Sequence, residues 1–542
     1  MSKRPPSGDV DVRLGSRTQT SPEPLDPETP FRLLVLGDFG GARAGPLATR
    51  KLHAVDRDVL EEELGRLQVT MDVRLENGRS ARIELRDLDD FHPDRLLERV
   101  DALAEWRKTR ERLENPRTFV EAASEVRAWA GPPPERRERA AAPAGGEDDI
   151  VGELLAGASR RAKPAADSAF EAELKAIVRP HLAPEEDSDL PRLREAVDEA
   201  RSGLLRAILS SPRFRELEAA WRSLDLLVRR AGEESIRIFF LDASREALLE
   251  DLTSHEKLSG TGLYRRLVTE TVDTPGAEPW GAILGLYDFG PTLADAALLA
   301  RMAKLARAAG APFLAGARSD FVGCASIAAT PDPSDWHAPE GEGAVIWEEL
   351  RALPEAAWVA LALPRLMLRR PYGAKTEPID SFPFEEIPDA PEHEAYVWGN
   401  AALACALVLT GAFEEGGWNL RPETAAEIQR LPTHVFKDGL ETRVTPPSEV
   451  VLTVRAVEKL LDAGLVPVLS LKGSESVRVA RLQSIAKPLR ALAGYPLVGH
   501  AKLPMSVHGH RTVPVPVPAV IQNDTLLFSW VRPKQPASAL QE

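Results

Sequence analysis

Acidic side chains follow apolar runs that are typical of buried strands, so carboxylate chemistry is the first to consider. Asp38 follows the run Phe31–Leu36, and Asp288 stands near the end of another such run. Carboxylates at strand ends can bind a metal ion or transfer protons. Asp89 and Asp90 could join them, but aspartate directly before a helix is also a common N-cap. No histidine or cysteine adjoins Asp288 in the sequence, so we interpret these carboxylates as structural and expect no catalytic, cofactor-binding or metal-binding residue.

Two further segments have side chains or amides of a kind that could bind a ligand. The segment Gly37–Gly41 (GDFGG) follows the first apolar run, and backbone amides in such a turn can bind a phosphate. It lacks the spacing of a dinucleotide fingerprint and the Gly-Lys-Ser/Thr of a P-loop. His508 and His510 form a His-Gly-His triplet, but no further ligands follow with metal-binding spacing. A structural turn and a solvated loop are therefore the favoured interpretations.

The block Leu363–Gly373 (LPRLMLRRPYG) combines apolar residues with three arginines. Guanidinium groups bind carboxylates through two parallel hydrogen bonds, and the acidic pair Glu385 and Glu386 follows in the sequence. Two interpretations remain open. The block is either an intersubunit clamp or a surface strand with solvated arginines.

Composition limits the classes of function. The chain of 542 residues is 43% hydrophobic and 28% charged, with a formal net charge of -15, which disfavours nucleic acid as a partner. The most apolar stretch, 398–413, is short and interrupted for a membrane span. The polar, proline-rich N-terminus lacks the core of a signal peptide, and Cys324 and Cys405 offer no disulfide framework. We expect a cytoplasmic protein without cofactors or membrane insertion.

Hydrophobic periodicity predicts an α/β fold with mixed sheets. An Asn77-Gly78 dipeptide between two alternating segments predicts a hairpin, and a long charged helix should begin around Pro93 with Asp89 or Asp90 as its cap. The segment 397–413 predicts an apolar helix. Other strands are predicted at 31–39, 236–241, 281–286, 313–315, 358–363 and 465–471, and other helices at 293–309 and 449–461.

Shifts in composition suggest six segments. A stretch rich in Pro, Ala and Gly (GPPPERRERAAAPAGGEDD) separates two modules. We expect a disordered lead (1–29), a small N-terminal module (30–117), a linker (118–150), a helical connector (151–210), a larger body (211–490) and a divergent C-terminal tail (491–542). The first module is small, so we also expect the strand at 31–36 to share the hydrophobic core of the body.

The first module resembles the small sheath subunit of type VI secretion systems. The similarity rests on PFRLLVLGDFGG, KLHAVDRDVLEEELGRLQVTMDVRLEN and IELRDLDDFHPDRLLERVDAL, and it covers about residues 30–116. The body resembles the large sheath subunit from about residue 204 to 488. The matching blocks include FRELEAAWRSLDLLV, EPWGAILGLYDFG, ALPRLMLRRPYG with FPFEE after it, AYVWGNAAL and PSEVVLTVRAVEKLLDAGLVPVLSLKGSESVRVARLQSIAKP.

The resemblance implies a mechanical function in place of an enzymatic one. Such subunits polymerise into a cytoplasmic helical tube around an inner tube protein, contract against a baseplate and are dismantled by an AAA+ ATPase. A small sheath-like module fused to a larger sheath-like body would fix the ratio of the two partners. The candidate residues for assembly are Trp221, Arg222, Arg365, Arg369, Pro371, Tyr372, Gly373, Trp398, Gly399 and Asn400.

The tail departs from the family pattern. It contains VPVPVP at 513–518, where every second residue lacks an amide donor, and then IQNDTLLFSWV at 521–531. We predict that the second segment pairs with a sheet edge, in its own subunit or in a neighbour, in place of the family's usual closing strand. Leu527, a further assembly candidate, would lie on the packed face. Because the tail differs where neighbours are linked, an alternative function is an adaptor, cap or baseplate-associated accessory protein that does not polymerise. An enzyme that uses the strand-end carboxylates is a more distant alternative.

Overall fold

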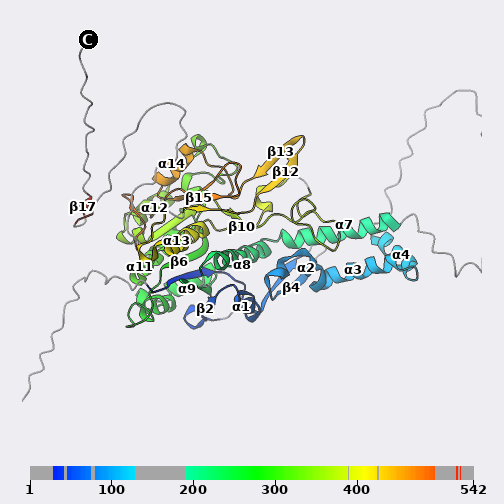
Figure 1. Ribbon diagram of the computed structural model, residues 1–542, viewed down its shortest axis with the longest axis horizontal. Coiled ribbons are helices and arrows are strands. Elements are labelled where there is room, and N and C mark those ends of the chain that lie inside the picture. Colours follow the sequence, from blue (N-terminus) through cyan, green and yellow to red (C-terminus); the bar gives the residue numbers. More distant parts are fainter. Residues whose placement is uncertain are drawn as a thin grey trace, which may run out of the picture. The chain divides into compact units, whose positions relative to one another are not determined.

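The computed structural model describes residues 28–41, 45–74, 80–129, 190–232, 234–337, 339–388, 390–423, 426–494, 521–522 and 525–526. The chain forms two compact units (Figure 1). The sheet unit comprises Met1–Val69, Glu216–Arg370 and Glu392–Glu542, and the helical unit comprises Thr70–Arg215 and Pro371–Pro391. The chain therefore passes from one unit to the other four times, and neither unit corresponds to one continuous segment.

A nine-stranded mixed sheet forms the centre of the sheet unit. Its middle strands, from β14 to β5, are parallel, and antiparallel strands extend it at both edges. The predicted fold class, α/β with mixed sheets, is confirmed. The strand order is β11 (Glu427–Ile428), β15 (Val477–Val479), β14 (Val466–Ser470), β8 (Val359–Leu363), β7 (Phe313–Ala317), β6 (Ala282–Phe289), β1 (Phe31–Gly37), β5 (Ile236–Asp242) and β2 (His53–Val55).

Strand β1 lies inside this sheet, although about 200 residues separate it from β5 and about 250 from β6 in the sequence (Figure 1). It pairs in parallel with β5 from Phe31 to Gly37 and with β6 from Leu33 to Leu36. A parallel strand buried on both faces requires a nearly continuous apolar run, which FRLLVLG provides. The expectation that this strand shares the core of the body is confirmed.

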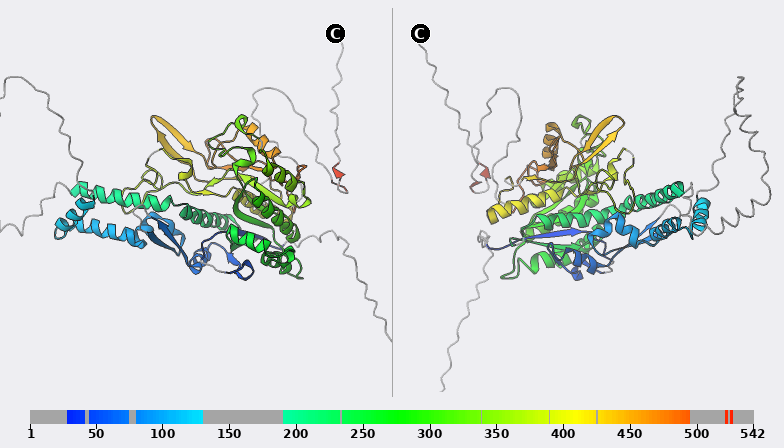
Figure 2. Two further views of the ribbon diagram at one scale, coloured as in Figure 1. Left: turned by 180° about the vertical axis from the view of Figure 1, so that it is seen from behind. Right: turned by 45° about the vertical axis from the view of Figure 1, so that its right-hand side comes forward.

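Helices cover both faces of the sheet. Leu34 and Leu36 of β1 belong to one apolar cluster with residues of α9 (Arg245–Thr253), α11 (Leu293–Ala309), α12 (Glu342–Ala352) and α14 (Val454–Asp462). Phe31 instead contacts Phe413 of α13 (Ala402–Gly416), with 5.2 Å between ring centroids. Because side chains alternate along a strand, these two sets of contacts lie on opposite faces. Figure 2 shows the layers from two further sides.

Helix α13 starts later than the periodicity predicted. Trp398 and Gly399 form strand β10 (Trp398–Gly399), which pairs with β9 (Leu366–Met367), so the helix begins only at Ala402. Residues 402–413 of α13 are buried except for the half-buried Gly411, as expected for a helix that is apolar all round, and the last turn is exposed.

The helical unit contains segments of both predicted modules. A hairpin of β3 (Val69–Arg74) and β4 (Ser80–Leu85) precedes α2 (Pro93–Arg99), α3 (Asp101–Glu114) and α4 (Phe119–Trp129). Residues of α3 and α4 form an apolar cluster with Leu193 and Val197 of α7 (Leu190–Leu209). Helix α4 occupies the beginning of the stretch that composition assigned to a linker. Helix α8 (Pro212–Arg230) continues from this unit into the sheet unit.

The long charged helix expected from Pro93 is interrupted, because Val100 has an extended backbone between α2 and α3. Its predicted cap was also wrong. His92 caps α2 by accepting a hydrogen bond from the Asp94 amide. Asp87 and Asp90 instead form a reciprocal capping box around the short helix η2 (Leu88–Phe91).

The remaining described elements are short. In the tail, β16 (Ile521–Gln522) pairs with β17 (Thr525–Leu526), whereas Leu527, His508 and His510 lie outside the described residues.

Among the helices that the structure describes, none is long and apolar enough to cross a membrane. Both cysteines are buried and free. The short elements are η1 (Leu47–Thr49), α1 (Leu60–Leu67), η3 (Leu258–Gly260), α10 (Gly262–Tyr264), the π-helical turn η4 (Arg265–Thr269), η5 (Ser319–Val322), η6 (Pro333–Asp335), η7 (Pro354–Trp358), η8 (His393–Ala395), η9 (Gly417–Asn419), and the hairpin β12 (His434–Asp438) and β13 (Glu441–Thr445).

Candidate assembly site

Trp221 of α8 fixes the end of β1. Its ring is fully buried and lies 5.2 Å from the ring of Phe39 and 5.6 Å from that of Phe240, centroid to centroid. The indole Nε1 donates a hydrogen bond to the Phe39 carbonyl at 3.1 Å. The Phe39 carbonyl thereby has a partner beyond the end of the strand ladder. This assembly candidate therefore joins the two predicted modules inside one chain.

The glycine-rich turn after β1 already binds an anion, which is the carboxylate of Asp242. The Phe39 amide donates to Asp242 Oδ1 at 2.9 Å, and the Gly41 amide donates to Oδ2 at 3.1 Å. The Gly40 amide donates to the Asp38 side chain at 3.0 Å. Gly40 has φ of 81°, and a Cβ there would lie 2.5 Å from the Leu217 side chain. These amides therefore support the structural interpretation of the turn over phosphate binding.

Arg369 and Arg222 share one buried carboxylate. Arg369 donates from Nε to Glu218 Oε1 at 2.6 Å and from Nη2 to Oε2 at 3.2 Å, and Arg222 donates to Oε1 at 2.7 Å. Glu218 is fully buried, and Arg369 is 8% exposed. Burial alone would raise the pKa of Glu218, but the two guanidinium groups hold it below its ordinary value. This triad ties α8 to the arginine-containing block.

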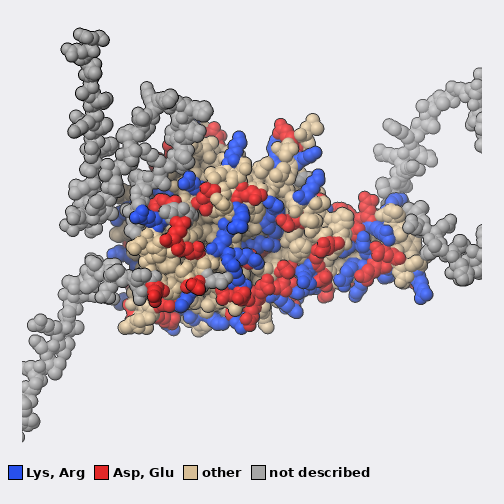
Figure 3. Space-filling view, viewed as in Figure 1, with Lys and Arg blue, Asp and Glu red and all other residues tan. Residues whose placement is uncertain are grey.

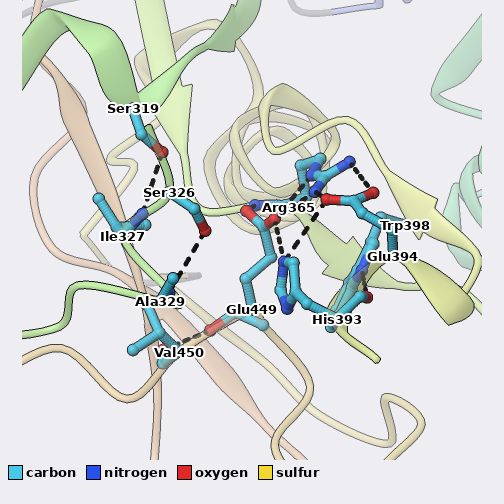
Figure 4. A network of polar contacts seen from close by, with 11 residues as sticks. Ser319, Ser326, Ile327, Ala329, Arg365, His393, Glu394, Trp398, Glu449 and Val450 are labelled. Carbon is cyan, nitrogen blue, oxygen red and sulfur yellow. Dashed lines mark hydrogen bonds and ion pairs between the residues drawn. The ribbon is translucent and has the colours of Figure 1, made fainter. Parts of the chain in front are cut away.

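Arg365 is the centre of a second polar network (Figure 4). Its Nε donates to Glu449 Oε1 at 2.7 Å and its Nη2 to Glu394 Oε1 at 2.7 Å, while its backbone amide donates to Glu449 Oε2 at 2.8 Å. His393 Nε2 lies 2.9 Å from Glu449 Oε1. Burial would raise the pKa of Glu449, but His393 and Arg365 lower it to about 2. The carboxylate therefore stays ionised at neutral and mildly acidic pH.

The arginines of the block have acidic partners in distant segments of the chain. Arg370 pairs with Glu475 at 3.0 Å, in addition to the pairs of Arg365 and Arg369 described above. Glu385 and Glu386 of the acidic pair accept hydrogen bonds from the backbone amides of Ala374 and Tyr372, respectively. A surface strand with solvated arginines does not describe Arg365 or Arg369. An intersubunit clamp stays a prediction.

His393, Glu394 and Glu449 also lie close enough together for one ligand atom of each to reach a common metal ion, all within 4.8 Å. The Arg365 guanidinium already contacts both carboxylates, and His393 contacts Glu449. A cation in this place would have to displace a side chain of the protein. The cluster fits an internal ion pair better than a metal centre.

Asn400 holds the strand-end carboxylate Asp288. Its Nδ2 donates to the Tyr287 carbonyl at 3.0 Å and to Asp288 Oδ1 at 2.9 Å, and its Oδ1 accepts from the Ala402 amide at 3.0 Å. Asp288 is exposed to solvent, but the surrounding protein removes enough water from around its carboxylate to raise its pKa to about 6. A Cβ on Gly316 would lie 1.9 Å from Asp288 Oδ1, so this close approach requires glycine.

Asp38 and Asp288 have different surroundings. The negative charge of Asp38 acts on Tyr287, whose hydroxyl donates to the Ala243 carbonyl at 2.6 Å. Tyr287 belongs to the apolar cluster that includes α9 and α11, whereas Asp288 accepts a hydrogen bond from Asn400 just before α13. This arrangement supports the structural interpretation of both carboxylates.

The other assembly candidates lie in or shortly after β9 and β10, the two short strands that pair with each other. Trp398 pairs with Met367 and Gly399 with Leu366, and the Trp398 indole donates to the His393 carbonyl at 2.7 Å. A Cβ on Gly399 would come within 2.7 Å of the Leu368 side chain. In the helical unit, Pro371, Tyr372 and Gly373 begin the segment Pro371–Pro391, where a Cβ on Gly373 would lie 2.2 Å from Glu385 Oε2.

Five carboxylates in these networks were not predicted from the sequence: Glu218, Asp242, Glu394, Glu449 and Glu475. Glu218 stands four residues before Arg222, a spacing that indicates an ion pair on a helix and could have identified it. Asp242 and Glu449 are separated from their partners by about 200 and 84 residues, and no local pattern points to them.

Comparison with known proteins assigns a family to this arrangement. The VipB model, described as the EvpB tail sheath N-terminal domain, matches residues 192–486, which is more than half of the chain. A model for the type VI secretion system protein VipA matches residues 10–129. The chain belongs to the type VI secretion sheath family. The predicted resemblance to both sheath subunits, in this order, is confirmed.

A curated relative supports the assignment. The chain is 32% identical over 307 residues to the type VI secretion system sheath protein TssC1 of Pseudomonas aeruginosa. The match covers 54% of this chain and 60% of the relative, so the chain spans less than two thirds of that protein's length. Strands β1 and β2 of the large sheet lie in the region that matches VipA, and its seven other strands lie in the region that matches VipB.

Proposed function

We propose that this protein is a structural subunit of a type VI secretion sheath that carries both sheath parts in one chain. It would polymerise in the cytoplasm into a helical tube around an inner tube protein. Contraction would act against baseplate components, and an AAA+ ATPase would dismantle the contracted form. The family matches and the sheath relative support this proposal.

One observation carries the proposal. Strand β1 of the VipA-like region lies between two strands of the VipB-like region and pairs with both of them. A central parallel strand cannot be removed without exposing the apolar faces and backbone groups of both neighbours. The two sheath parts therefore depend on each other for folding, as one subunit of a load-bearing tube requires.

The charged groups support a mechanical function. The carboxylates that could have served catalysis, Asp38 and Asp288, accept hydrogen bonds from a backbone amide and from Asn400. The ion pairs of Arg365 and Arg369 connect segments far apart in sequence, which makes the sheet unit resistant to local deformation. On the face drawn in Figure 3, acidic and basic side chains are interspersed, a pattern that suits specific protein contacts.

We further propose that the assembly candidates act by holding the subunit in one conformation that neighbours recognise. Trp221, Arg222, Arg365, Arg369 and Asn400 all use their polar groups inside the chain. Their substitution should therefore weaken the subunit before it weakens a lattice contact.

Negative-stain imaging and sedimentation of the full chain test the function, alone and together with the products of neighbouring genes. Tubes of uniform diameter are expected, in the same samples in which a fast-sedimenting species appears. A stable small species that never forms tubes with these partners would instead support the adaptor, cap or baseplate-associated alternative.

A further inference from the structure

The segment Pro371–Glu386 forms a closed loop within the helical unit. The Tyr372 amide donates to Glu386 Oε2 at 2.8 Å, and the Glu386 amide donates back to the Tyr372 carbonyl at 2.8 Å. Near the start of the loop, the Thr376 hydroxyl donates to the Pro371 carbonyl at 2.6 Å. The loop therefore has its ends joined, in the manner of a compact Ω-loop.

Asp94 of α2 holds the far side of this loop. Its Oδ2 accepts from the Asp380 amide at 3.0 Å, and its Oδ1 accepts from the Ser381 amide at 3.1 Å and from the Ser381 hydroxyl at 2.5 Å. Burial alone would raise the pKa of Asp94, but the hydrogen bonds from Ser381 and Asp380 hold it below its ordinary value. The ring of His92, two residues earlier, contacts the ring of Tyr372 at 4.9 Å.

Helix α7 holds the apolar part of the same loop. The Arg201 guanidinium lies 4.3 Å from the centroid of the Phe382 ring, and Arg206 donates to the Glu385 carbonyl at 3.0 Å. Phe382 and Phe384 are 5% and 3% exposed. Cation–π contact and burial account for the placement of these rings, whereas Asp94 is the side chain that binds the backbone at 380–381 among the residues that the structure describes.

We propose that Asp94 is a positioning residue, a latch that fixes the loop of the VipB-like region onto a helix of the VipA-like region. The exchange of segments is then reciprocal. The VipA-like region gives β1 to the sheet unit, and the VipB-like region gives the loop to the helical unit. The latch adds to the contacts of His92 and α7 the hydrogen bonds that fix the backbone at 380–381. It acts within the single chain and does not require that the protein polymerises.

Limited trypsin digestion of the full chain tests the latch, because Lys375 lies exposed in the loop. Cleavage after Lys375 requires the loop to open locally. Asp94→Asn should accelerate this cleavage about tenfold, the effect of losing one charge-assisted hydrogen bond on an opening equilibrium. Cleavage after Lys304, which is exposed on α11 of the sheet unit, should keep its rate. Mass spectrometry of the released peptides measures both rates.

Two further variants make the test specific. Asp89→Asn removes an exposed carboxylate from the short helix before α2 and should leave the cleavage rate at Lys375 unchanged. Ser381→Ala removes only the hydroxyl contact and should give a smaller acceleration than Asp94→Asn. The latch is refuted if Asp94→Asn and Asp89→Asn are cleaved at Lys375 at the wild-type rate. Equal acceleration at Lys375 and Lys304 in both Asp94→Asn and Ser381→Ala would also refute it, since it would indicate general destabilisation.

Discussion

Replacing Glu449 by glutamine should lower the free energy of unfolding of the sheet unit by about 3 kcal/mol at pH 7. The estimate follows from the difference between the ordinary pKa of 4.5 and the folded-state pKa of about 2, since a pKa difference of one corresponds to about 1.4 kcal/mol. The Glu449 side chain is 10% exposed, so solvent screens the interaction little. Glutamine retains the size of the side chain but removes the buried negative charge beside Arg365, whose remaining ion pair is with the exposed Glu394.

The effect should depend on pH in a defined direction. Because the folded-state pKa of Glu449 is depressed, its contribution to stability is complete above the ordinary pKa of 4.5 and is lost as the pH falls toward 2. At pH 3.5 the difference between wild type and Glu449→Gln should shrink to about 2 kcal/mol by the same relation. Urea unfolding followed by tryptophan fluorescence measures both values, and Trp398, stacked on His393 at 5.1 Å, reports locally.

Glu394→Gln is the matched control. Its side chain is 68% exposed, although it contacts the same guanidinium, so its loss should cost less than about 1 kcal/mol. If Glu449→Gln and Glu394→Gln unfold at the same urea concentration at pH 7, the network does not stabilise the fold as reasoned. A loss for Glu449→Gln that is the same at pH 7 and pH 3.5 would contradict the ionic origin of the effect.

Three further results are expected. The surrounding protein partly dehydrates the exposed Asp288 and raises its pKa to about 6, so its contribution to stability is lost as the pH rises from about 4 through 6. Asp288→Asn should reduce that fall in the melting temperature and remove no turnover, and an unchanged pH profile or a lost hydrolytic activity would contradict this. The isolated fragment 1–130 should not unfold cooperatively, because β1 would lack both of its neighbours; a stable monomeric fragment in calorimetry would show otherwise. Removing the residues after Pro518 should reduce fast-sedimenting assemblies, and replacing Leu527 by aspartate should do the same. The sheet unit should still melt as in the full chain. If the truncated and full-length proteins sediment identically, the tail has no lattice role.

Local patterns in the sequence were sufficient for several elements of the fold, although α4 lies in the predicted linker and α14 begins at Val454, five residues later than predicted. The continuous apolar run FRLLVLG predicts a strand buried on both faces, and apolar residues at helical spacing predict α11 and α14. The predicted start of α13 and the predicted cap of α2 were wrong because contacts that the prediction did not include determine them. Pairing of Trp398 and Gly399 with β9 delays the start of α13, and the Asp87–Asp90 capping box moves the cap of α2 to His92.

The sequence by itself determined the family, the α/β class and the dependence of the first strand on the body, because these follow from periodicity and from ordered blocks of residues. Only the tertiary structure decided which carboxylate each arginine binds. Arg365 and Glu449 are 84 residues apart, and Arg369 and Glu218 are 151 apart. It also decided that Pro371–Pro391 belongs to the helical unit, held there by Asp94. Such pairings depend on which distant side chains the packed strands and helices bring together. A short stretch of sequence contains no information about the distance in space between its side chains and those of a remote segment.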